Sequence, residues 1–191
     1  MKRIIIAALL IASVNVNASN NTGAYKKCME DMECATLYKS QVRRGDKSPF
    51  MTSTKRCKQS RDCRKIAEAI VYEARSEPFA GGVLVAQVIL NRKVDKRYGS
   101  TVYSVVHKPG AFSYVRDMRR QKRPTVQDHV IAEFIAWYAM QGKWRNHWGN
   151  VKPTHYWRYD AKSERRYRNS KKMQYLGRIG NHKVYREVSE G

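Results

Sequence analysis

The sequence predicts a mainly helical α+β domain with a small β-hairpin or sheet, preceded by a short disulfide-bearing segment. Apolar residues recur at helical spacing through the middle of the chain, a turn dipeptide stands between two extended stretches near its end, and all four cysteines precede residue 64. A chain of 191 residues is expected to form one domain. We expect an accessory segment over residues 19–63 and the main domain over residues 64–191.

Residues 1–18 are predicted to be a secretory signal peptide. Lys2 and Arg3 precede an apolar run over residues 4–12, and Ala18 supplies a small residue at the expected cleavage point. The run is shorter than the ~20 residues of a membrane-spanning helix, and no later stretch is apolar enough to span a bilayer. We therefore expect export to the periplasm, the cell envelope or the medium, with no membrane span after cleavage; an uncleaved anchor is the alternative.

The cysteines form two pairs with the same spacing. Cys28 and Cys34 make the first pair, and Cys57 and Cys63 make the second. In an oxidising compartment four cysteines form two disulfides, for which three connectivities are open. A four-thiolate zinc site is the alternative, although zinc ligands usually have about two to four residues between them. We expect disulfides and no metal, with two short helices or turns in the accessory segment.

Two helices are predicted at the start of the main domain. Apolar residues at helical spacing predict the first over residues 64–75, and Pro78 ends it. The second is expected to start after the pair Gly81–Gly82 and to end near Asn91–Arg92. Its sequence is almost continuously apolar, which is typical of a buried central helix.

A third helix and a few strands are predicted in the remainder. The helix is expected over residues 126–141, with Thr125 as its N-terminal cap. A strand is expected over residues 154–159. Residues 175–188 alternate around Gly180–Asn181, which predicts a β-hairpin that turns at this dipeptide.

The charge of the chain restricts the choice of partners. The formal net charge is +22 and the sequence pI is about 10.1, so nucleic acid, anionic lipid and anionic cell-envelope polymers would all be attracted. Two clusters, Arg116–Arg123 and Arg158–Lys172, carry much of this charge, and Tyr159 and Tyr167 are interleaved in the second. Because the chain is predicted to be exported, we expect anionic envelope polymers as partners and no specific nucleic acid. A solvated basic face is the alternative.

The stretch over residues 71–78 contains the best candidate for chemistry, Glu73. A carboxyl group at the end of an apolar helix, among aromatic neighbours, can remain protonated near neutral pH and act as a general acid. The alternative is a structural salt bridge with Arg75 or Arg92. The sequence contains no His-Glu-x-x-His motif and no Gly-rich phosphate loop, so we expect no cofactor.

Several blocks of the chain resemble, in order and spacing, the SleB-like cell wall hydrolases, which are peptidoglycan hydrolases of the spore-cortex-lytic type. The blocks are residues 70–78, 85–92 and 108–113, with further similarity at 154–157 and 178–186. The resemblance implies a lysozyme-related or transglycosylase-like fold, action on the glycan strands of peptidoglycan, and Glu73 as the catalytic glutamate. Glu77 takes the second acidic position of the motif, for which the resemblance implies structural or substrate-side support. Ser76 stands where the family usually has Gly.

A single catalytic acid favours a lytic transglycosylase over a hydrolase. A hydrolase generally needs a second carboxylate, whereas in a transglycosylase the C6 hydroxyl of the substrate attacks and leaves a 1,6-anhydro product. Sugar contacts are expected from groups that stack or form hydrogen bonds, with core packing as the alternative for each. These candidates are Tyr72, Phe112, Ser113, His155, Tyr156, His182 and Tyr185.

Two questions about function stay open in the sequence. A non-catalytic cationic module that binds envelope polymers or nucleic acid is the alternative to an enzyme. An enzyme of this kind serves either wall remodelling by the cell or lysis by a phage, as an endolysin. We expect a monomer in either case.

Overall fold

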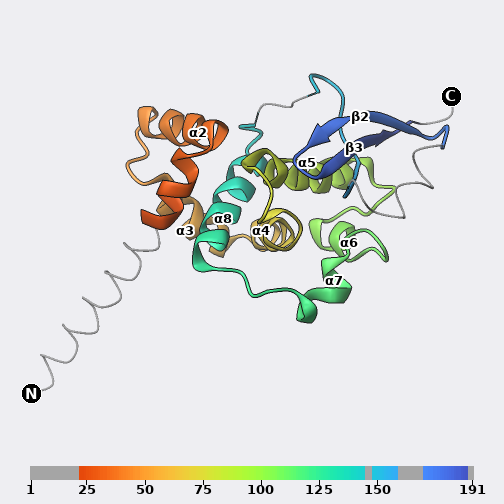
Figure 1. Cartoon of the computed structure of the whole chain (residues 1–191), viewed down its shortest axis with the longest axis horizontal. Coiled ribbons are helices and arrows are strands. Elements are labelled where there is room, and N and C mark those ends of the chain that lie inside the picture. Colours follow the sequence, from red (N-terminus) through yellow and green to blue (C-terminus); the bar gives the residue numbers. More distant parts are fainter. Residues whose placement is uncertain (1–21, 145–147, 159–169, 189–191) are drawn as a thin grey trace, which may run out of the picture.

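A layer of packed helices and a small antiparallel sheet make up the computed structural model, which describes residues 22–144, 148–158 and 170–188 (Figure 1). The predicted signal peptide and most of the basic cluster Arg158–Lys172 lie outside the described residues. The mainly helical α+β class is confirmed. No helix in the described part of the chain combines the length and the apolar character that a bilayer crossing requires.

The accessory segment is helical and contains disulfides, as predicted, although its described part has three helices and not the two expected. A helix over residues 22–29 is followed by α2 (Met32–Arg43) and α3 (Pro49–Gln59). The carboxylate of Asp31 caps α2 by accepting hydrogen bonds from the backbone N–H groups of Glu33 and Cys34, at 3.0 Å each. The disulfide Cys28–Cys34 joins the first of these helices to α2.

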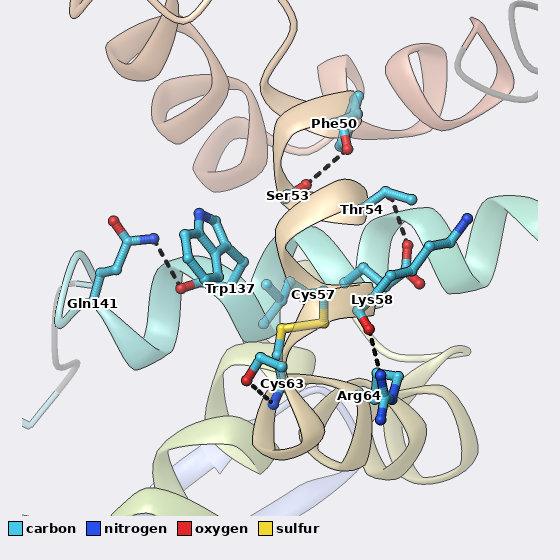
Figure 2. Close-up of a disulfide and its surroundings, with 12 residues drawn as sticks. Phe50, Ser53, Thr54, Cys57, Lys58, Cys63, Arg64, Trp137 and Gln141 are labelled. Carbon is cyan, nitrogen blue, oxygen red and sulfur yellow. Dashed lines mark hydrogen bonds between the residues drawn. A yellow bond between two sulfur atoms is a disulfide. The ribbon is translucent and has the colours of Figure 1, made fainter.

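The second disulfide joins α3 to α4 (Arg61–Ala74). Cys57 and Cys63 are bonded across the break between the two helices, as Figure 2 shows. Of the three possible connectivities, the structure therefore has the one that pairs sequence neighbours. Within the described residues, no group of three or more His, Cys, Asp or Glu side chains is arranged to hold a metal ion.

Helix α4 starts earlier than predicted, at Arg61, because Ser60 caps it. The hydroxyl of Ser60 accepts a hydrogen bond from the backbone N–H of Cys63 at 3.2 Å. The apolar face of α4, including Ile66 and Ile70, is buried.

Helix α5 (Phe79–Asp95) corrects the prediction that Gly81–Gly82 precedes the second helix. Both glycines lie inside α5, and neighbouring atoms leave no room for a side chain at either position. A Cβ on Gly81 would lie 2.6 Å from Cβ of Glu77, and one on Gly82 would lie 2.6 Å from Cδ1 of Ile135. The glycine pair therefore allows close packing and does not mark a turn.

Helix α8 (Val126–Met140) agrees with the prediction and occupies the centre of the helical layer. Thr125 forms a capping box at its start, and α8 packs against α3, α4 and α5. The ring of Phe134 lies 4.8 Å from that of Phe50 in α3, so the accessory segment and the main domain share one core.

Three short elements were not predicted. They are α6 (Val102–His107), α7 (Tyr114–Asp117) and the 3₁₀ turn η1 (Met118–Arg120). Elements of this length contain too few residues to show a helical period, and they form where Val105 and Tyr114 enter the core.

The sheet contains the predicted hairpin. Strands β2 (Met173–Ile179) and β3 (His182–Glu187) pair in antiparallel fashion, and β1 (His155–Arg158) pairs with the other edge of β3. Leu84 and Val88 of α5 pack against Val184, which places this sheet on α5 (Figure 1).

Candidate active site

Glu73 lies in the last turn of α4, where three segments of the chain meet. Its Oε1 accepts a hydrogen bond from the backbone N–H of Tyr114 at 3.3 Å and one from the hydroxyl of Ser113 at 3.4 Å. Its Oε2 accepts one from the hydroxyl of Tyr156 in β1 at 3.5 Å. The carboxyl group is thus held between α4, the start of α7 and the sheet.

Burial raises the pKa of Glu73, and its hydrogen bonds with Tyr114, Ser113 and Tyr156 oppose part of that rise. A raised pKa extends the pH range in which the carboxyl group carries its proton. The group is therefore better suited to donate a proton than an exposed glutamate would be.

The structure contains neither of the salt bridges that the sequence left open for Glu73. Arg75 donates through Nη1 to the backbone carbonyl of Lys122, and Arg92 donates through Nε to the carbonyl of Thr154 at 2.7 Å. No ion pair involves Glu73 within the described residues. The carboxyl group is therefore not held as a permanent anion by a cation.

Tyr156 is held as a hydrogen-bond donor. Burial raises the pKa of its phenol well above the usual value, and the charge of Glu73 adds to the rise, so the phenol keeps its proton. Its ring centroid lies 4.7 Å from that of His182, edge to face, and 6.4 Å from that of Phe112. These rings hold the hydroxyl in place beside Glu73.

Tyr114 was missed in the sequence, although it directly follows the block over residues 108–113. Its ring is fully buried and stacks on that of Tyr72, with centroids 5.3 Å apart and planes 7° apart. The stack anchors the backbone N–H that contacts Glu73. Burial also raises the pKa of the Tyr114 phenol, and the charge of Glu68 adds to it.

Arg92 also helps to form the site, although the sequence suggested for it only a salt bridge with Glu73. It is buried in α5, and its guanidinium lies 5.2 Å from the ring centroid of Tyr98 and 5.4 Å from that of Phe112. With its hydrogen bond to Thr154, it ties α5 to the start of the sheet. Its buried position carried no clear signal in the sequence, because Arg92 stands beside Asn91 and Lys93 at the polar end of the helix.

Glu77 binds the turn of the β2–β3 hairpin. Its carboxylate accepts hydrogen bonds from the backbone N–H of Asn181 at 2.8 Å and from Nδ2 of the same residue at 3.2 Å. Gly180 has a φ of +52°, and a Cβ there would lie 2.1 Å from Oε2 of Glu77. This contact fixes the segment after Glu73 to the hairpin and gives Glu77 a supporting role.

The remaining predicted residues are placed differently. Phe112 and Tyr185 are 5% and 1% exposed, and His182 is buried, so these rings support the site from the core. Ser113 is exposed at Glu73. Nδ1 of His155 lies 3.0 Å from Oγ1 of Thr154. Burial lowers the pKa of this imidazole to about 3, and the charges of Arg92 and Arg97 add to the effect. The His155 ring therefore stays neutral.

Comparison with known proteins identifies relatives of the chain. The spore cortex-lytic enzymes of Bacillus subtilis and Bacillus cereus are 36% and 43% identical to the chain over 78 residues, or 40% of its length. The aligned part spans only 26% and 30% of those two proteins.

Two solved structures are also similar. The catalytic domain of the Bacillus cereus SleB protein is 27% identical, with a TM-score of 0.45 over 65% of this chain and 89% of that one. The catalytic domain of the germination-specific lytic transglycosylase SleB from Bacillus anthracis is 26% identical, with a TM-score of 0.48 over 66% of this chain and 96% of that one.

The sequence model of one family matches residues 76–185, a segment that includes Glu77, Ser113 and Tyr156 and begins just after Glu73. Since that segment is more than half of the 191 residues, the chain belongs to the Cell Wall Hydrolase family, and the resemblance inferred from the sequence is confirmed.

Proposed function

We propose that the protein is an exported enzyme that cleaves the bond between N-acetylmuramic acid and N-acetylglucosamine in peptidoglycan, with Glu73 as its acid and base. The observation that carries the proposal is the half-buried carboxyl of Glu73, whose raised pKa and three hydrogen-bond donors suit proton transfer. Membership of the Cell Wall Hydrolase family supports this substrate class.

In the first step, Glu73 donates its proton to the glycosidic oxygen while positive charge develops on the muramic acid ring. The carboxylate left behind is stabilised by its hydrogen bonds with Tyr114, Ser113 and Tyr156, since such bonds favour the ionised form. The three hydrogen-bond donors that lower the pKa of Glu73 thus also stabilise the negative charge that forms on it during the reaction.

In the second step, the C6 hydroxyl of the same sugar attacks C1, and the Glu73 carboxylate takes the hydroxyl proton. The product is a 1,6-anhydro sugar, and Glu73 regains its initial protonation state. Glu73 is thereby sufficient for both proton transfers, which makes the protein a lytic transglycosylase.

The other carboxylates near Glu73 are bound to other groups, which supports a transglycosylase over a hydrolase. Hydrolysis would use a second carboxylate as a nucleophile or as a base for water. Within the described residues, Glu77 is bound to Asn181, and the carboxylate of Glu68 lies 2.9 Å from Nζ of Lys65. Glu77 binds none of the three donors that contact Glu73, and Glu68 acts on the phenol of Tyr114 and not on Glu73 itself.

Mass spectrometry of the soluble products released from peptidoglycan tests the proposal. We expect 1,6-anhydromuramic fragments from the parent, and a rate lower by about 10²- to 10⁴-fold for Glu73→Gln, which keeps the shape of the side chain but cannot transfer the proton. Glu30→Gln, at an exposed position, is the matched control and should cleave like the parent.

Other products would change the conclusion. Reducing-end muramic acid would identify a hydrolase. If the parent protein released no fragments, the proposed activity would be wrong and the cationic binding module would replace it.

A further inference from the structure

The segment over residues 116–123, here called the basic segment, carries far more positive charge than the fold uses. It holds five cations and one acid, Asp117. All five cations are exposed: Arg116, Arg119, Arg120, Lys122 and Arg123. Like charges at this density repel one another, so the segment favours an anionic partner.

Little of this charge is neutralised within the protein. The exposed guanidinium of Arg116 lies 3.1 Å from the carboxylate of its neighbour Asp117, and a pair of this kind contributes little to stability. In the part of the chain that the structure describes, Arg119, Arg120, Lys122 and Arg123 form no ion pair.

Both ends of the basic segment are tied to the surroundings of Glu73. At its start, Arg116 is two residues after Tyr114, whose backbone N–H lies 3.3 Å from Oε1 of Glu73. Two residues of chain span at most about 7 Å. Near its end, the carbonyl of Lys122 accepts a hydrogen bond from Arg75, two residues after Glu73. The segment therefore borders the proposed cleavage site.

The chemistry of peptidoglycan identifies the anion that a substrate presents at this position. The glycan strand itself carries no charge, but each muramic acid bears a peptide stem with free carboxylates. That sugar contributes C1 to the bond that is cleaved, and three stem residues reach about 10 Å from it. Four of the five cations are arginines, whose planar guanidinium matches a carboxylate with two parallel hydrogen bonds.

We propose that the basic segment binds the carboxylates of the peptide stems and thereby favours glycan strands whose stems carry free carboxylates over strands whose stem carboxylates are amidated. This inference rests on the proposed function, and it adds a charged subsite to the neutral groups around Glu73.

The test compares two forms of the same sacculi, both freed of phosphate-bearing polymers. One form is native, and in the other the peptide carboxylates are converted to amides, so that glycan and peptide stay the same and only the charge changes. At low salt we expect the parent to cleave the native form about tenfold faster than the amidated form, because two exposed charge-assisted contacts together contribute about that factor. High salt should reduce this ratio of rates. Binding is measured in parallel by co-sedimentation.

A double variant, Arg119→Gln with Arg120→Gln, should bring the ratio close to one in both assays. Arg43→Gln with Arg44→Gln is the matched control, because it removes the same charge from exposed positions at the end of α2, which lies across the helical layer from α7 in Figure 1. The control should keep the ratio of the parent. Thermal melting monitored by circular dichroism establishes that both double variants fold.

Three results would overturn the inference. The parent could cleave and bind the two forms of sacculi equally, or both double variants could lose the preference for native sacculi to the same extent. The third is a variant of the basic segment whose cleavage rate falls by the same factor on native and amidated sacculi. Absence of cleavage by the parent would refute the proposed function instead, and the binding ratio would still decide the inference.

Discussion

The hydroxyl of Tyr156 acts on the proton affinity of Glu73 in a defined direction. As a donor at 3.5 Å from Oε2, it favours the ionised carboxylate and lowers the pKa of Glu73 against the rise due to burial. Because the proposed acid must be protonated, activity is expected to fall as the pH rises through that pKa. Tyr156 thus contributes, with Tyr114 and Ser113, to lowering the upper pH limit of activity that burial raises.

Tyr156→Phe should move the alkaline limb of the pH–activity profile to higher pH. The variant keeps the ring contacts with His182 and Phe112 and removes only the donor, so the pKa of Glu73 rises further. The rate at the optimum should fall by about tenfold, since the carboxylate formed in the first step loses one hydrogen bond. Profiles of kcat measured on peptidoglycan check both effects.

Tyr175→Phe is the matched control, because that phenol is exposed on β2. Its profile should be the same as that of the parent. An alkaline limb in Tyr156→Phe that stays in place or moves to lower pH would show that Tyr156 does not act through Glu73.

Among the elements, the β2–β3 hairpin depends on a glycine at its turn. Gly180 combines a positive φ with a close approach to Glu77, whose carboxylate binds Asn181 in the same turn. A side chain at Gly180 would force the carboxylate away from Asn181. The loop that follows Glu73 would then lose its contact with the sheet.

Gly180→Ala should lower the free energy of unfolding by about 2 kcal/mol or more, of which about 1 kcal/mol is backbone strain at positive φ. Gly142→Ala separates the two contributions, because Gly142 has a φ of +65° but no atom near a new Cβ. Urea unfolding of both variants measures the difference. Equal losses would show that the contact with Glu77 contributes nothing to stability.

At the scale of the whole molecule, the accessory segment is part of the fold. Asp31 accepts a hydrogen bond from the backbone N–H of Phe79 at 3.1 Å, and the hydroxyl of Thr54 donates to Glu133 at 2.6 Å. With the contact between Phe50 and Phe134, these interactions join residues before α4 to α5 and α8. One core of this kind should unfold in one step.

Calorimetry is therefore expected to show a single transition. Cys28→Ala with Cys34→Ala should move the whole transition to lower temperature, because removing the loop closure destabilises the protein by about 2 kcal/mol, or roughly 4–8 °C. Both sulfur atoms are buried, so alanine avoids adding a polar group. Two separate transitions, only one of them shifted, would show that the accessory segment folds independently.

Much of the fold was predictable because its signals are local. Helical spacing and the Thr125 cap predicted α8, the Gly180–Asn181 turn predicted the hairpin, and the cysteine spacing favoured the disulfides. The Gly81–Gly82 pair misled because a glycine needed for helix packing has the same sequence signature as one needed for a turn.

The sequence by itself determined the helical framework, the hairpin and the identity of Glu73 as the candidate acid, since periodicity, caps, turns and motifs lie within a few neighbouring residues. Only the tertiary structure decided what surrounds that acid. Tyr114 and Tyr156 lie 41 and 83 residues away along the chain, and the burial that raises the pKa of Glu73 arises when α4, α7 and β1 pack together. Contacts over such separations and the exclusion of water depend on how the elements pack, which no local pattern records.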